Sequence, residues 1–156
     1  MILPFMLVAY LGSVEVGNGV AISMRTSLVA RTTADLATQF LTIKNADMTN
    51  IMNAAAAVMA PYSAAPVKVT VSLVTTDGSG NGKIVWSDTL NGTTRPVGQS
   101  VTLPANLQTP NVSFIWSEVQ YAYTPNLGYV MTGTLSLSDS AFMYPRLANS
   151  VARINS

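Results

Sequence analysis

Residues Met1–Met24 read MILPFMLVAYLGSVEVGNGVAISM and contain a single charged side chain, that of Glu15. A helix needs about 20 apolar residues to cross the hydrocarbon core of a bilayer. A charge at the centre of such a helix costs on the order of 2.5–3.5 kcal/mol on insertion, and less near its boundary. Because Glu15 lies toward the end of the segment, this stretch predicts a membrane-spanning helix.

A cleaved secretory signal peptide is the alternative interpretation of this segment, because the apolar run is short and small residues follow it. No basic region precedes the run, and the helical pattern continues past the place where cleavage would fall. We therefore expect a retained anchor over residues 1–24, followed by a single domain over residues 25–156.

The composition of the whole chain excludes several classes of function. The 156 residues carry a net charge of +1 and include no histidine and no cysteine. So small a charge gives no long-range field for nucleic acid, which is disfavoured as a partner. Without histidine and cysteine there is no Ser-His-Asp triad, no thiolate nucleophile, no disulfide and no imidazole or thiolate zinc site. We expect no catalytic residue, no cofactor and no metal site, and hence a protein that is not an enzyme.

A helical pattern continues beyond the apolar segment. Val29, Leu36, Phe40 and Ile43 are seven, four and three residues apart, which places them on one stripe of a helix. The spacing predicts a helix from about Leu3 to about Lys44, roughly 60 Å long. Its second half is amphipathic and needs an apolar partner.

A second helix is predicted over Met48–Ala60, with Asp47 as its N-cap and Pro61 at its end. A kinked continuation of the first helix is the alternative.

From Val67 the apolar period changes from 3.6 to 2, which is typical of half-buried strands. The predicted strands and turns are Val67–Leu73, a glycine-rich turn at Asp77–Gly82, a return strand from Ile84, a short strand at Ser100–Leu103, a strand over Val112–Tyr123 and a last strand over Tyr129–Leu137. Apolar residues change parity between Trp116 and Val119, which predicts a bulge near Glu118. The expected fold is α+β and pilin-like, with a long N-terminal helix on about four antiparallel strands.

Two stretches carry a resemblance to a known family. The first is ILPFMLVAYLGSVEVGNGVAISMRTSLVARTTADLATQF, over Ile2–Phe40, and the second is SEVQYAYTPNLGYVMTGTLSLSDSAFMYPR, over Ser117–Arg146. In this order they resemble the TadE/TadG-like minor pilins of bacterial tight-adherence (Flp-type) pili. The first matches the family's apolar "ILP" run, its Glu-containing turn and its Arg-x-x-Leu segment. The second is similar to its "E-x-x-Tyr-x-Tyr-Thr-Pro" strand and its terminal "Tyr-x-Pro-Arg".

The resemblance implies a non-catalytic pilus subunit, held in the bacterial inner membrane by its N-terminal helix and carrying an extracytoplasmic domain. The implied partners are other pilin and minor pilin subunits, the assembly machinery of the inner membrane, and membrane lipid. The residues expected to anchor the helix or to contact neighbouring subunits are Pro4, Glu15, Val29, Leu36, Phe40 and Ile43. The alternative is a membrane-tethered adhesin or ligand-binding module that is not built into a filament.

The sequence departs from the family at its beginning. Members carry a basic segment and a Gly-x-x-x-x-Glu processing site before the apolar run, whereas here no glycine lies five residues before Glu15. Arg25 and Arg31 follow the span, so the positive-inside rule alone would hold the following domain in the cytoplasm. A basic leader upstream of Met1 would reverse this orientation, and we expect an in-frame Gly-x-x-x-x-Glu there. A processed form or a different assembly route is the alternative.

Some polar groups have two interpretations. Glu15 either pairs with a cation of a neighbouring subunit and sets axial register, or lies at the headgroups. The pattern from Asp77 to Asp88 formally fits a relaxed calcium loop, but strand-like flanks favour a solvated hairpin turn.

Three further sets complete the candidate residues. Glu118, Asp139 and Asp88 are expected to solvate strand faces rather than form an acid–base pair. Arg146 is expected to bond carbonyls or a carboxylate at the end of the sheet. The candidate aromatic residues are expected to pack in the core rather than form a binding patch; they are Trp86, Trp116, Tyr121, Tyr123, Tyr129 and Tyr144.

Overall fold

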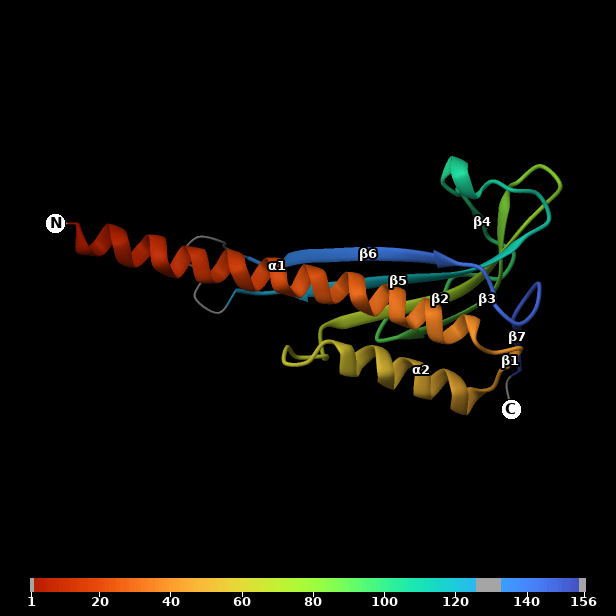
Figure 1. Cartoon of the computed structure of the whole chain (residues 1–156), viewed down its shortest axis with the longest axis horizontal. Coiled ribbons are helices and arrows are strands. Elements are labelled where there is room, and N and C mark those ends of the chain that lie inside the picture. Colours follow the sequence, from red (N-terminus) through yellow and green to blue (C-terminus); the bar gives the residue numbers. More distant parts are fainter. Residues whose placement is uncertain (1, 126–132, 155–156) are drawn as a thin grey trace.

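The computed structural model describes residues 2–125 and 133–154. One long helix lies along an antiparallel sheet, and a second helix folds back beside it (Figure 1). In chain order the elements are α1 (Leu3–Thr38), β1 (Thr42–Ile43), α2 (Asn45–Val58), β2 (Val67–Thr76), β3 (Gly82–Leu90), β4 (Ser100–Val101), the short 3₁₀ helix η1 (Ala105–Leu107), β5 (Ser113–Tyr123), β6 (Leu135–Met143) and β7 (Ala152–Arg153). The chain has the predicted α+β fold, with five strands in the main sheet where about four were expected.

Helix α1 begins at Leu3, directly before Pro4, and ends earlier than the sequence predicts. Pro4 lies in the first turn, where its missing N–H and fixed φ are compatible with a helix. The helix ends at Thr38, and the expectation that it continues to Lys44 is wrong. The next residues pair instead with the C-terminal strand: the Ala152 N–H donates to the Leu41 carbonyl oxygen at 3.0 Å, and β1 lies parallel to β7. This pairing joins residues about 110 positions apart, so local periodicity carries no sign of it.

Helix α2 folds back along α1, which excludes the kinked continuation (Figure 1). It begins at Asn45, and the expectation that Asp47 is its N-cap is wrong, because Lys44 occupies that position. Asp47 lies in the first turn and accepts a hydrogen bond from the backbone N–H of Lys44 at 3.0 Å. The carboxylate therefore still satisfies a free N–H at this helix end.

The main sheet has the strand order β4-β3-β2-β5-β6, and every neighbouring pair is antiparallel. The predicted hairpin joins β2 and β3. The predicted last strand is present as β6 from Leu135, while its expected first part, with Tyr129 and Met131, lies outside the described residues.

Both faces of the sheet carry a core, and this removes the need for the predicted bulge. Val67, Val69, Val71 and Leu73 face α1 and α2 in the larger core. On the opposite face Phe114 and Trp116 join a smaller core that includes Val74, Ile84 and Leu103. Strand β5 pairs with β2 without interruption, so the expected bulge near Glu118 is wrong; the irregularity lies between Leu73 and Val74, where β2 pairs with β3. The apolar residues of β5 change parity because Phe114 and Trp116, in its first part, are buried on the face opposite α1.

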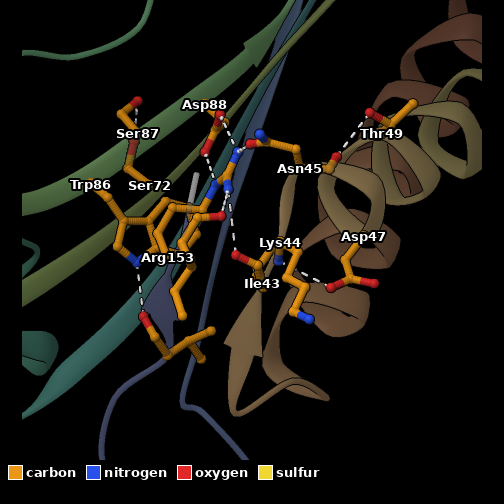
Figure 2. A network of polar contacts seen from close by, with 12 residues as sticks. Ile43, Lys44, Asn45, Asp47, Thr49, Ser72, Trp86, Ser87, Asp88 and Arg153 are labelled. Atoms are coloured by element: carbon orange, nitrogen blue, oxygen red, sulfur yellow. Dashed lines mark hydrogen bonds and ion pairs between the residues drawn. The ribbon is translucent and has the colours of Figure 1, made fainter. Parts of the chain in front are cut away.

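The segment over residues 144–154, which we call the C-terminal strap, holds the helix junction to the sheet. Arg153 donates to both carboxylate oxygens of Asp88, at 2.8 and 3.3 Å, and to the Asn45 side-chain oxygen at 2.8 Å (Figure 2). It also donates to two backbone carbonyls, those of Ile43 and Ile154. All five N–H donors of the guanidinium are thereby used. Trp86 adds a hydrogen bond from its indole N–H to the carbonyl of Val151 at 2.8 Å.

The same strap contacts the end of α1. The backbone N–H of Arg146 donates to the Thr38 carbonyl at 3.1 Å, and the Arg146 side chain forms an ion pair with Asp35. The expectation that Arg146 bonds a carboxylate is confirmed, and the carboxylate belongs to the long helix.

Candidate functional site

Helix α1 has a free N-terminal end that projects beyond the sheet (Figure 1). Residues 2–10 are exposed, and the first buried residue is Gly12. Leu3 is 80% exposed and Phe5 is 76% exposed. The helix is long and apolar enough to cross a membrane.

From Gly12 onward one face of α1 is buried against the rest of the chain. Gly12, Glu15, Gly19, Ile22 and Thr26 are buried and are spaced three or four residues apart, as one helical face requires. Small side chains on this face let α1 lie close to the sheet. Burial thus begins at Gly12, twelve residues before the predicted end of the anchor at Met24. The boundary between anchor and domain stays a prediction.

Glu15 belongs to this inward face and is 2% exposed. It is engaged within the chain rather than free. Burial raises the pKa of the Tyr123 hydroxyl, and the negative charge of Glu15 adds to this effect. Glu15 is therefore held near the end of β5, and its predicted pairing with a neighbouring subunit stays a prediction.

The opposite side of α1 presents apolar side chains to the surroundings. Val16, Val20, Met24 and Leu28 recur every fourth residue and are 45–69% exposed. Together with the free end they form what we call the apolar outer face of α1, made by Leu3, Phe5, Met6, Leu7, Val8, Tyr10, Val14, Val16, Val20, Met24 and Leu28.

Most of the six residues predicted to contact neighbouring subunits lie away from the apolar outer face. Val29 and Ile43 are fully buried in the chain's own core, and Leu36 and Phe40 pack against that core. Pro4 alone among the six lies in the free end. The apolar side chains that stay exposed on α1 are those of the apolar outer face, which the i, i+4 spacing from Val16 to Leu28 could have revealed.

Two of the three strand carboxylates have arginine partners that the sequence did not indicate. Glu118 forms a two-point ion pair with Arg95, at 2.6 and 2.7 Å, and Asp88 pairs with Arg153. Asp139 is exposed on β6. In residues 2–125 and 133–154 no three acidic groups gather in a way that could hold a metal ion.

The residues of the formal calcium pattern do not converge. Asp77 lies in the hairpin turn, where one carboxylate oxygen accepts the N–H groups of Ser79 at 2.8 Å and Asn81 at 2.9 Å. Asp88 lies in β3 opposite Val71, at the other end of the strand. The solvated turn is therefore the interpretation that the geometry supports.

Asp77 gives a prediction for pH dependence. Hydrogen bonds from the backbone and side chain of Asn81, and from the backbone of Ser79, hold the pKa of Asp77 below its ordinary value. Because the folded-state pKa is the lower one, the stabilisation is fully present above about pH 4 and is lost as the pH falls through the folded-state value. We expect Asp77→Ala to unfold at lower urea concentration than the parent at pH 7, with the difference shrinking below pH 4. A difference that grows on acidification would contradict this.

The predicted core role of the aromatic residues is confirmed for four of them. Trp86, Trp116, Tyr121 and Tyr123 are each 9% exposed or less. Tyr144 is half exposed and packs against Phe114, while Tyr129 lies outside the described residues.

The geometry defines a class of protein: an α+β domain on a long helix whose outer face is apolar. Comparison with protein-family models, curated proteins and solved structures gives no match.

Proposed function

We propose that this chain is a non-catalytic minor pilin-like subunit of a tight-adherence pilus. In this proposal α1 holds the subunit in the bacterial inner membrane, the domain is extracytoplasmic, and the subunit takes part in assembly or priming of the pilus. The supporting observation is the division of α1 into one face packed on its own sheet and another that stays apolar and exposed.

The apolar outer face of α1 is the strongest support for an anchoring and packing role. Burial of apolar surface is worth about 25 cal/mol per Å². Large contiguous apolar patches on a folded chain mark membrane or protein contacts. The same face can meet lipid in the membrane and equivalent helices in a filament, without any change in the sheet-facing side.

The free end alone is too short for a full span. Leu3–Leu11 extends for about 13 Å along the helix axis, whereas a bilayer core is about 30 Å thick. The proposed anchor therefore also uses the outer face beside the sheet, as far as Met24.

Two exposed positions allow a matched test in the full-length chain. Val20 lies on the apolar outer face of α1 and is 50% exposed, while Asn50 is an exposed polar residue on α2, outside the proposed anchor. We expect Val20→Lys to reduce both membrane association and incorporation into sheared pili at least tenfold, because a charge is costly in the membrane. We expect Asn50→Lys to behave like the parent. The measurements are fractionation and immunoblotting in the source bacterium, with circular dichroism to verify folding.

Deletion of the exposed residues 2–10, which leaves the buried face of α1 from Gly12 onward in place, separates the two candidate functions. Loss of pili in the deletion strain supports the subunit role. Normal pili would contradict that role. They would favour the tethered ligand-binding module, which is supported by a polar hollow on the face of the sheet opposite α1.

A further inference from the structure

The outer face of the sheet, away from α1 and α2, is polar over half its length. Lys68 lies opposite Gln120, and Thr70 lies opposite Glu118, in the register of β2 and β5. The next strand continues both rows, because Ser138 faces Gln120 and Ser140 faces Glu118. Adjacent strands are about 4.8 Å apart, so these side chains form an ordered grid of hydroxyl, amide and charged groups.

A hollow of about 390 Å³ lies on this grid, and the loop after β3 forms one wall of it. We call it the polar groove; the side chains that matter are Lys68, Thr70, Arg95, Gln99, Glu118 and Gln120. Its volume falls within the range of small-molecule sites. Its hydrophilic lining suits a ligand with many hydroxyl groups rather than an apolar one.

Arg95 is held in one orientation at the wall of the groove. Two of its nitrogen atoms, Nε and Nη2, donate to the Glu118 carboxylate. The guanidinium carbon lies 4.2 Å from the centre of the Trp116 ring, and the Arg95 backbone N–H donates to Ser87 Oγ at 3.0 Å. Its third nitrogen, Nη1, donates to no residue in the described part of the chain. A fixed cationic donor is thus left available for a ligand.

The charges of the groove favour an anion. Its lining contains two cations, Lys68 and Arg95, and one carboxylate, Glu118, which leaves one positive charge. Lys68 is exposed and forms no ion pair with a described residue.

We propose that the polar groove binds an acidic saccharide, a sugar chain that bears carboxylate groups. The carboxylate of the ligand pairs with Lys68 and Arg95 Nη1. Its hydroxyl groups exchange hydrogen bonds with Gln99, Gln120 and Thr70. This proposal does not depend on assembly into a pilus, because the groove lies on the face of the sheet opposite α1.

The test uses the full-length protein in detergent micelles, titrated with tetragalacturonate and followed by amide chemical shifts. The comparison ligands are fully methyl-esterified tetragalacturonate, which lacks the charge, and acetate, which lacks the sugar. We expect saturable shifts at Gly92, Thr94 and Gln99 and at least tenfold tighter binding of tetragalacturonate than of either comparison ligand. The affinity should fall as salt rises, because exposed charges are screened.

Two lysine variants give the matched control. Lys68→Gln should weaken binding of tetragalacturonate at least tenfold, whereas Lys83→Gln, an exposed lysine on β3 outside the groove, should leave it unchanged. Equal binding of the methyl ester or of acetate, an unaffected Lys68→Gln variant, or the absence of saturable shifts at the groove would each overturn the proposal. None of these results bears on pilus assembly, so the two proposals fail separately.

Discussion

Replacing Arg153 with leucine is expected to lower the free energy of unfolding by about 3 kcal/mol, because a largely buried, fully hydrogen-bonded ion pair loses one partner. The Arg153 side chain is 10% exposed, and its removal leaves Asp88 and the Asn45 side-chain oxygen without their donor. Parallel pairing of β1 with β7 then also weakens, since Arg153 belongs to β7. Urea denaturation of the full-length chain in micelles measures the effect.

The control for this variant lies in the same strap. Arg146 pairs with Asp35, but its side chain is 60% exposed, so Arg146→Leu should cost at most about 1 kcal/mol. Arg153→Lys should fall between the parent and the leucine variant, because an ammonium group has three N–H donors and cannot donate to all five acceptor oxygens that surround the guanidinium. Equal losses for Arg153→Leu and Arg146→Leu would show that the buried network does not lock the strap.

Replacing Phe114 with alanine is expected to cost about 3–5 kcal/mol, the usual range for deleting a buried phenylalanine. Phe114 is fully buried in the smaller core and lies against the Tyr144 ring, with centroids 4.7 Å apart. The cavity would open between the sheet and the segment that carries Leu103, on the face opposite α1. Thermal unfolding with circular dichroism gives the measurement.

Val97→Ala is the matched control for Phe114→Ala. Val97 is 74% exposed, and loss of its methyl groups should change stability by less than about 0.5 kcal/mol. A Phe114→Ala variant as stable as the Val97→Ala variant would mean that the second face of the sheet contributes no core.

The sequence predicted the elements whose signals are local. The uncharged run around Leu3–Leu11 and the alternation over Val67–Leu73 each lie within one element, so the long N-terminal helix and the inward face of β2 were correctly assigned. The bulge near Glu118 was predicted wrongly because alternation shows which parity is apolar, but not that a distant segment covers the second face.

The candidate site was predictable only in part. That α1 is long and apolar enough to cross a membrane follows from composition along one helix. The inward position of Glu15 depends on where β5 and β6 lie, and the contact residues proposed from spacing turned out to fill the chain's own core. An apolar stripe indicates that one face of a helix is buried. It does not indicate whether the covering surface belongs to the same chain or to another.

The sequence by itself determined that a long apolar helix precedes an antiparallel sheet, and that histidine and cysteine chemistry is excluded, because these properties belong to composition and to short-range period. Only the tertiary structure decided that Arg153 reaches Asp88 and that Arg95 reaches Glu118. These partners are 65 and 23 positions apart along the chain, so their contact arises from the order of strands in the sheet rather than from any spacing between the residues.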